Sequence, residues 1–229
     1  MAKKHWKKYL EVAKLVDKNK KYSIDEAVQL IKKVAYTKFP ATIELHIKTT
    51  ADPRYQDQMI RGTVVLPHWT WKQVRVAAFV SDDKIKEAKE AGADIVWNQD
   101  LLEKIKNGEI DFDVLVTTPD MMRELAKVAK ILWPRWLMPS PKSGTVTPNI
   151  TEAIKQIKKG RVEFKLDKTW NIHIPVGKVN FTEEQLKENI EAAINAILEA
   201  KPSGIKWRLF KNVVITPTMW PSIKLDIQG

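Results

Sequence analysis

The chain has 229 residues, 44% of them apolar, and 39 Lys and Arg against 28 Asp and Glu give it a formal net charge of +11. It has no cysteine, which excludes disulfides and cysteine-ligated metal sites. No apolar run approaches the roughly 18 residues of a membrane span and no apolar segment follows the first residues, so a cytosolic protein with an anionic partner is predicted, nucleic acid ahead of membrane.

The positive charge is unevenly distributed. Between residues 68 and 159 there are 15 Lys and Arg and 13 Asp and Glu, which leaves 24 against 15 for the two ends of the chain. The ends therefore carry +9 and the middle +2. We expect the anionic partner to bind mainly where the two ends fold.

The N-terminal part begins with a lysine-rich segment over residues 1–21, which fits either a flexible basic arm or a solvated helix. Ser23 and Glu26 form the S-x-x-E pattern of a capping box, which predicts a helix over residues 24–34. Apolar and polar residues then alternate, which is typical of strands with one covered face. These strands are predicted over residues 42–49 and 59–66.

After Pro67 the pattern changes to apolar strands separated by helices, an order typical of a parallel sheet covered on both faces. Gly160 is the expected C-cap of the last helix. Strands are predicted over 74–80, 95–96 and 114–117, and helices over 83–91, 101–106, 119–132 and 151–159.

Alternation returns from Arg161. The first two strands after it are expected to form a hairpin through residues 167–170, and Thr182 is the expected N-cap of a long amphipathic helix. Strands are predicted over 162–166, 171–175, 206–216 and 223–227, and the helix extends to about residue 200.

These patterns of apolar and polar residues predict a two-domain α/β protein. The two termini would build a discontinuous two-layer α/β domain, residues 1–67 and 160–229, which would bind the anionic partner. A three-layer Rossmann-like α/β domain, residues 68–159, would be inserted into it. Two closely spaced chain crossings would then act as a hinge.

The alternative function is a cytosolic nucleotide-dependent enzyme that uses the inserted domain. Neither a G-x-G-x-x-G nor a G-x-x-x-x-G-K-[ST] motif is present. The four histidines are scattered, and the pair Asp111 and Asp113 is more typical of a solvated strand start than of a general acid and base. No catalytic residue, metal or cofactor is therefore expected.

A proline-rich loop over residues 130–146 stands out, because its prolines exclude both a helix and a central strand. From its residues alone, a crossover loop with solvated charges is favoured over a binding loop. With glycine in place of Trp133 and Trp136, however, it resembles the L-G-P-R-G-L-M-P-x-P-K-x-G-T-V signature of the bacterial ribosomal protein L1 family. Further matches lie in the expected order along nearly the whole chain, among them Asp52-Pro-Arg, Ile60-Arg-Gly-Thr63, Leu66-Pro-His68, Ala91-Gly-Ala-Asp94, Pro119-Asp-Met121, Asn171-Ile-His173 and Pro175-Val-Gly-Lys178.

The resemblance implies a structural protein of the large ribosomal subunit and not an enzyme. It implies binding to a folded region of 23S rRNA that forms the mobile L1 stalk, near the E site from which deacylated tRNA leaves. It also implies repression of translation through a similar fold in the protein's own mRNA. The implied location is the cytoplasmic ribosome, with rRNA, E-site tRNA, mRNA and other large-subunit components as partners.

The same resemblance implies which residues contact RNA. Lys38 and Phe39 match one RNA-contacting element, and Thr218 and Met219, followed by Trp220, match another. From the residues alone, a core position for Phe39 and a plain hairpin turn at Thr218 are favoured over RNA contacts. A further family motif matches Asp167, Lys168 and His173, for which a direct contact, a supporting role and a structural role all stay open; Arg135 and Lys142 are candidates for a secondary RNA contact.

The chain departs from the family pattern at its tryptophans, which stand where the family has, or commonly has, glycine. An indole is expected to be strained where glycine supplies a positive φ, notably at Trp133, Trp136 and Trp170, and at Trp220 it opposes close approach of RNA. An intact-mass measurement tests directly whether these side chains are present. The nine positions are Trp6, Trp69, Trp71, Trp97, Trp133, Trp136, Trp170, Trp207 and Trp220.

Overall fold

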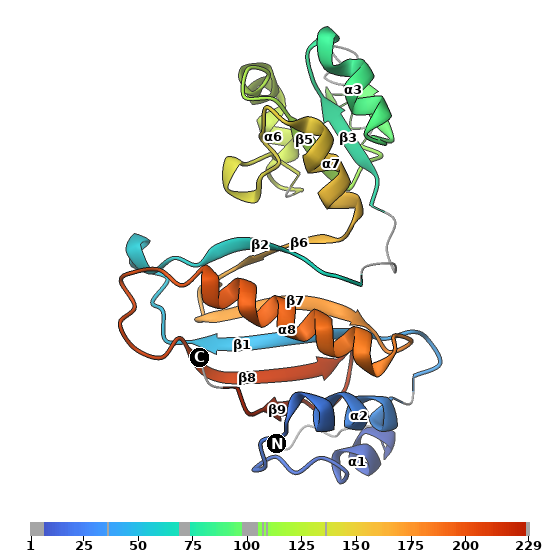
Figure 1. Cartoon of the computed structure of the whole chain (residues 1–229), viewed down its shortest axis with the longest axis vertical. Helices are drawn as coiled ribbons and strands as arrows, with labels where there is room; N and C mark the ends of the chain where they lie inside the picture. The colour runs from blue at the N-terminus through green and yellow to red at the C-terminus, as the bar shows by residue number, and fades with distance from the viewer. Residues whose placement is uncertain are drawn as a thin grey trace. The chain divides into compact units, whose positions relative to one another are not determined.

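The computed structural model describes residues 7–35, 37–68, 74–97, 105–106, 108, 110–135 and 137–227. The chain divides into two compact units, one formed by Met1–Trp71 and Val162–Gly229 and the other by Lys72–Arg161. We call them unit 1 and unit 2. Unit 1 contains both ends of the chain, and the fold as a whole is mixed α/β with antiparallel and parallel sheets (Figure 1).

Unit 1 is built on a four-stranded antiparallel sheet in the order β7-β1-β8-β9. The predicted strand over residues 42–49 is confirmed as β1, which lies between two partners of the same length and pairs with both in antiparallel register. The strands are β1 Thr42–Thr49, β7 Asn171–Lys178, β8 Phe210–Pro217 and β9 Ile223–Leu225.

Alternation along β1 separates a covered face from an open face. Ile43, Leu45 and Ile47 are fully buried in the core of unit 1. Helices α2 (Ile24–Val34) and α8 (Glu183–Glu199) cover that face with their apolar sides (Figure 1). The opposite face of the sheet is therefore left to polar side chains.

The helix termini follow the capping signals in the sequence. The backbone N–H of Glu26 donates to Ser23 Oγ at 3.2 Å, so α2 begins where the capping pattern predicted. The helix ends at Val34, the last residue predicted for it. Thr182 and Gln185 form a complete reciprocal capping box at the start of α8. The first helix, α1 (Lys7–Ala13), has no buried residue.

The predicted hairpin over residues 162–175 is wrong. Strand β6 (Arg161–Lys165) pairs with β2 (Arg61–Val65) in a separate two-stranded sheet, whereas β7 pairs with β1. Among the described residues a single bridge, Leu166 to Ile172, joins the two segments. The turn between them leads the chain from one sheet to the other. The alternation of apolar and polar residues does not show this, because it predicts which face of a sheet a side chain lies on and not which strands pair.

Unit 2 contains a parallel three-stranded sheet in the order β4-β3-β5. The central strand β3 (Val76–Phe79) is buried along its whole length. Its neighbours are β4 Ile95–Trp97 and β5 Val114–Thr117.

The parallel sheet is packed on both faces, as predicted. Val76 and Ala78 belong to an apolar cluster that includes residues of α3 (Ile85–Glu90) and α7 (Ile150–Lys158). Ala77 and Phe79, which point the other way, belong to a second cluster with the helical segment over residues 122–132. Successive residues of one strand therefore contribute to different cores.

Several predicted helices of unit 2 have different bounds. The helix predicted over 119–132 is three short pieces, α5 Met122–Leu125, η3 Ala126–Val128 and α6 Ala129–Leu132. The helix over 151–159 begins one residue earlier, because the Asn149 side chain accepts from the N–H of Glu152. Most of the helix predicted over 101–106 lies outside the described residues.

The tryptophans behave differently from one another. Trp133 has φ −62° in the right-handed helical region and a side chain 71% exposed, so the strain expected there is absent. Trp170 has φ +64°, in the left-handed region that favours glycine, so strain is confirmed at this position. Trp136 lies outside the described residues.

Replacing Trp170 with glycine should stabilise the protein. A bulky residue at positive φ costs on the order of 1–2 kcal/mol, which glycine does not incur. We expect Trp170→Gly to raise the free energy of unfolding by about 1 kcal/mol in urea denaturation at unchanged m value. The control Trp207→Gly, at an exposed position whose φ is not positive, should give no such gain; equal gains at both positions would contradict the explanation by backbone strain.

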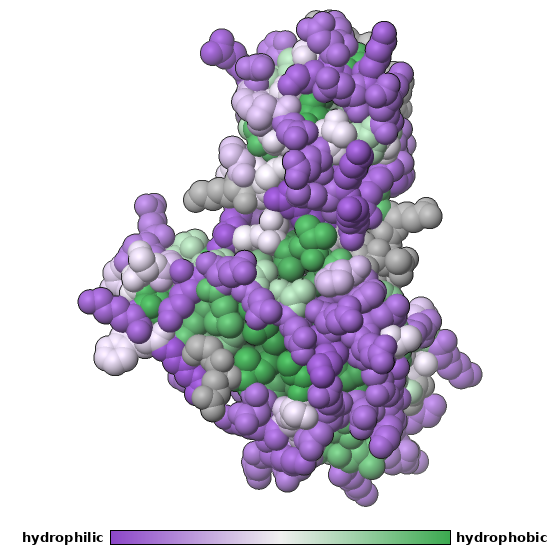
Figure 2. Space-filling model, in the orientation of Figure 1, coloured by the Kyte–Doolittle hydropathy of each residue, from purple (hydrophilic) through white to green (hydrophobic). Residues whose placement is uncertain are grey.

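Hydrophilic residues cover most of the face shown in Figure 2, with apolar side chains visible over unit 1. Within the described ranges no helix combines the length and apolarity needed to cross a bilayer. In the same ranges no three His, Cys, Asp or Glu side chains are grouped as metal ligands would be.

Candidate nucleic-acid interface

One corner of unit 1 brings the two predicted RNA-contacting elements together. The backbone N–H of Thr218 and its hydroxyl both donate to the carbonyl oxygen of Thr42, at 2.9 and 3.1 Å. This places the turn after β8 beside the start of β1, three residues beyond Phe39. The side chains of Phe39 and Met219 are 50% and 76% exposed, so neither belongs to the core. We call residues 38–42 and 216–220 the first corner.

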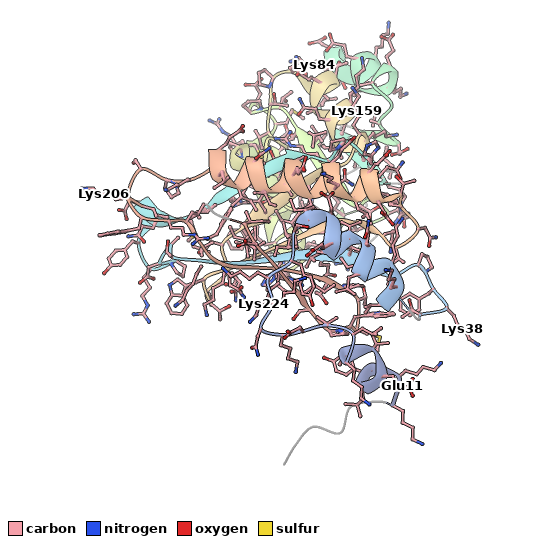
Figure 3. All side chains as sticks on the ribbon, turned by 60° about the horizontal axis from the view of Figure 1, so that its bottom comes forward. Glu11, Lys38, Lys84, Lys159, Lys206 and Lys224 are labelled. Carbon is pink, nitrogen blue, oxygen red and sulfur yellow. The ribbon has the colours of Figure 1, made fainter. Side chains whose placement is uncertain are left out.

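Lys38 adds a cation to the first corner. Its side chain is exposed and extends away from unit 1, at the end opposite Lys206 (Figure 3). Thr37 Oγ1 donates to the carbonyl oxygen of Phe39 at 2.9 Å, which fixes the backbone between them. A cation and an aromatic ring are thus displayed side by side, as contacts to phosphate and to a base or sugar require.

The turn that carries Met219 is tight and strained. The N–H of Trp220 donates to the carbonyl oxygen of Pro217 at 3.2 Å, and Met219 between them has φ +72°. Positive φ in a residue other than glycine is costly and accumulates at functional sites. At this turn the flexible thioether of Met219 is exposed to solvent.

Trp220 does not contribute its ring to this corner. Its side chain is 7% exposed and lies in the core cluster of unit 1. Its carbonyl oxygen accepts from Thr216 Oγ1 at 3.2 Å, so its backbone closes the turn. The residue predicted as an RNA contact is therefore a core residue, because the turn directs its indole toward the apolar side of the sheet.

The second group of predicted residues lies in the turn over residues 167–170. The Asp167 carboxylate accepts from the N–H groups of Thr169 and Asn171, at 2.8 and 2.7 Å, and from the Thr169 hydroxyl. Partial burial acts to raise the pKa of Asp167, but these hydrogen bonds outweigh it and hold the pKa below its usual range. Asp167 thus has a structural role in the turn, while the neighbouring Lys168 is exposed.

His173 faces His46 across the sheet, in register between β7 and β1. Their Nδ1 atoms lie 2.7 Å apart and their rings form an edge-to-face pair. The outer nitrogens point at carboxylates: His46 Nε2 lies 3.5 Å from Glu44, and His173 Nε2 lies 3.5 Å from Asp167. Only one proton fits between the two Nδ1 atoms, so protonation of both would separate the rings.

The histidine pair gives unit 1 a pH dependence. Burial, together with the charge of His173, lowers the pKa of His46, and Glu44 opposes this only partly. Because the folded chain then binds fewer protons than the unfolded chain, stability is complete above the ordinary histidine pKa and falls as the pH drops below it. We expect His173→Gln to raise the pKa of His46 in an NMR titration of the imidazole; an unchanged or lower pKa would show that the pair is not coupled.

Four residues on the open face of the sheet were not predicted as site residues. Glu44 and His46 share the polar side of β1 with Thr42, and Lys178 Nζ donates to Thr42 Oγ1 at 2.8 Å. The alternation over residues 42–49 carried the signal, since it placed these side chains on one face. Lys178 could not be found that way, because its place depends on the register of β7 against β1.

The two groups mark the ends of one surface. Thr42 opens β1 at the first corner, and Lys48 near its other end is opposite Asn171, beside the turn of Asp167 and Lys168. Eight residues of antiparallel strand span about 24 Å. The open face therefore offers a polar track with exposed cations at both ends, which fits a folded nucleic acid.

The two remaining candidates belong to unit 2. Arg135 is exposed, in the proline-rich loop after α6. The structure describes the backbone of Lys142, which belongs to the short helix η4 (Pro141–Ser143), but not its side chain. They are not part of the surface on unit 1.

The chain is similar over nearly its whole length to ribosomal proteins. A model of the ribosomal protein L1p/L10e family matches residues 31–221, and the chain belongs to this family. It is 55% identical over 224 residues to the large ribosomal subunit protein uL1 of Thermosipho africanus, covering 97% of both chains. It is 52% identical over 225 residues to the uL1 protein of Kosmotoga olearia, covering 98% of this chain and 97% of that one. The family is one of ribosomal proteins, which confirms that the chain is not an enzyme.

Proposed function

We propose that this protein is a constituent of the large ribosomal subunit that binds 23S rRNA through the open face of the unit 1 sheet and so forms the mobile L1 stalk. Family membership supports the ribosomal role. The observation that carries the proposed site is the first corner, where Phe39 and Met219 are exposed on elements that meet at Thr42. In the ribosome of the cytoplasm, it would assist release of deacylated tRNA from the E site and would repress translation by binding a similar fold in its own mRNA.

The proposed domain organisation is the division predicted from the sequence pattern. Residues 1–67 and 160–229 would form a discontinuous two-layer RNA-binding domain, and residues 68–159 an inserted three-layer Rossmann-like domain. The compact units support this division, although their limits differ from it by a few residues. The two chain crossings would allow the inserted domain to move while the first domain holds RNA.

The proposed contacts divide by chemistry. Lys38 and Lys168 would neutralise phosphates, whereas Phe39 and Met219 would lie against a base or sugar. The Thr218 hydroxyl already donates its proton to Thr42, so toward RNA it can act only as an acceptor. Its partner would therefore be a donor such as a ribose 2′-OH. His173 would support this surface through its pairing with His46.

Filter binding of 23S rRNA fragments by the full chain, at 50 and 200 mM salt, tests the proposal. One fragment should bind at least about a thousandfold more tightly than the others, the margin typical of specific over non-specific sites. That preference should persist at the higher salt, because it comes from shape and base contacts. Equal binding of all fragments, with affinity set by salt alone, would overturn it.

A further inference from the structure

The helical segment over residues 122–132 of unit 2 has two distinct faces. Leu125, Val128 and Leu132 are buried in the unit 2 core. Arg123, Lys127 and Lys130 are exposed. The exposed three alternate along the segment with the three buried residues, so they form a row of cations on its solvent-facing side. Arg135, exposed in the loop that follows, extends the row.

This row carries the whole net charge of unit 2. Residues 72–161 contain 16 Lys and Arg against 13 Asp and Glu, a net charge of +3. Residues 121–135 alone contain four basic residues and one acidic residue, Glu124, which is also +3. The rest of unit 2 is therefore neutral, with 12 of each sign. The excess charge of the unit therefore lies in this one stretch of the sequence.

The cations of the row also lack local partners, unlike several others in the unit. Lys158 pairs with Asp94 at 3.1 Å, and Arg75 lies within 4 Å of Asp111 and Asp113. Within the described parts of the chain, none of the four residues of the row has an ion pair or side-chain hydrogen bond. Their positive charges are therefore available to an anionic ligand.

We propose that the row of Arg123, Lys127, Lys130 and Arg135 is a second RNA contact, made by unit 2 to the phosphate backbone. Exposed cations without ion pairs, gathered within one short segment, fit the closely spaced anions of a phosphate backbone. The inference rests on the proposed function, because it supplies a second site for the RNA held by unit 1.

The test compares two triple variants of the full chain that remove the same charge from unit 2. One is Arg123→Gln with Lys127→Gln and Lys130→Gln. The matched control is Lys86→Gln with Lys89→Gln and Lys155→Gln, all exposed helical positions interspersed with acidic residues. Affinity for the preferred 23S rRNA fragment is measured from 50 to 200 mM salt, and circular dichroism checks folding.

The row variant should bind about tenfold more weakly at 100 mM salt, and its salt slope should fall by roughly 2, the value for three lost phosphate contacts. The control should keep the wild-type slope. Identical slopes in both variants would overturn the row as a site. Row-dependent binding of vesicles containing phosphatidylserine, without any effect on RNA binding, would overturn RNA as its partner.

Failure of this second contact can be distinguished from failure of the proposed function. If no rRNA fragment is preferred by the wild type, the function of unit 1 fails. If a fragment is preferred and Phe39→Ala weakens its binding, but the row variant does not, only the second contact fails.

Discussion

Phe39→Ala should weaken binding of the preferred rRNA fragment by about 5- to 100-fold, because stacking of an exposed ring on a base contributes about 1–3 kcal/mol. The ring is 50% exposed and outside the core, so the free energy of unfolding should change little. The salt slope should also stay unchanged, since no charge is removed. Binding isotherms at several salt concentrations, beside denaturation curves, measure both quantities.

Lys38→Gln provides the matched control one residue away. It should lower the salt slope by about 0.7–0.9, the value for one phosphate contact, while the preference among fragments persists. Thr218→Val should remove part of the preference, and Thr218→Ser should retain it, because only the serine keeps the hydroxyl acceptor. Equal salt slopes and equal losses for the Phe39 and Lys38 variants would contradict the division of roles.

Asn189→Ala should destabilise unit 1 strongly. Asn189 is fully buried in α8; its Oδ1 accepts from the N–H of His68 at 3.0 Å, and its Nδ2 donates to the carbonyls of His68 and Val176 at 2.9 and 2.8 Å. Removing the amide leaves the buried carbonyl of Val176 without a partner, at about 1–3 kcal/mol, and takes a partner from each of the two partly buried backbone groups of His68, at a smaller cost. We expect a loss of about 3 kcal/mol in urea denaturation, allowing for partial relaxation and entry of water.

The control for this prediction is Asn195→Ala on the same helix, whose side chain is exposed. Alanine favours a helix over asparagine, so this variant should be as stable as the wild type or slightly more stable. Similar losses in both variants would show that helix propensity and not the buried network is responsible. Because His68 is the last described residue before the crossing into unit 2, the network also fixes where the chain leaves unit 1.

Local signals in the sequence predicted much of the secondary structure. The Ser23 capping box and the alternation of β1 are short-range patterns, and both elements appear with the predicted bounds. The partner of β6 was not predictable, since pairing depends on long-range register. The burial of Trp220 was also missed. The direction of its ring is set by the turn in which Met219 has positive φ.

The candidate site was predictable only in part. The exposure of Phe39 and Met219 could not be read from composition, which favoured a core phenylalanine and a plain turn. The hydrogen bonds of Thr218 to Thr42 join segments 176 residues apart, beyond any local pattern. The Asp167 turn was found by its motif, but only the geometry shows that its carboxylate is used within the turn.

Site-specific photo-crosslinking tests most directly whether the open face of unit 1 holds one folded RNA. A photoreactive side chain would replace Phe39, Met219 or, as control on the covering helix α2, the exposed Lys33. The account predicts that the first two positions cross-link to neighbouring nucleotides of a single folded 23S rRNA element, and that Lys33 does not. Cross-links from Phe39 and Met219 to unrelated regions, or equal cross-linking from Lys33, would contradict it.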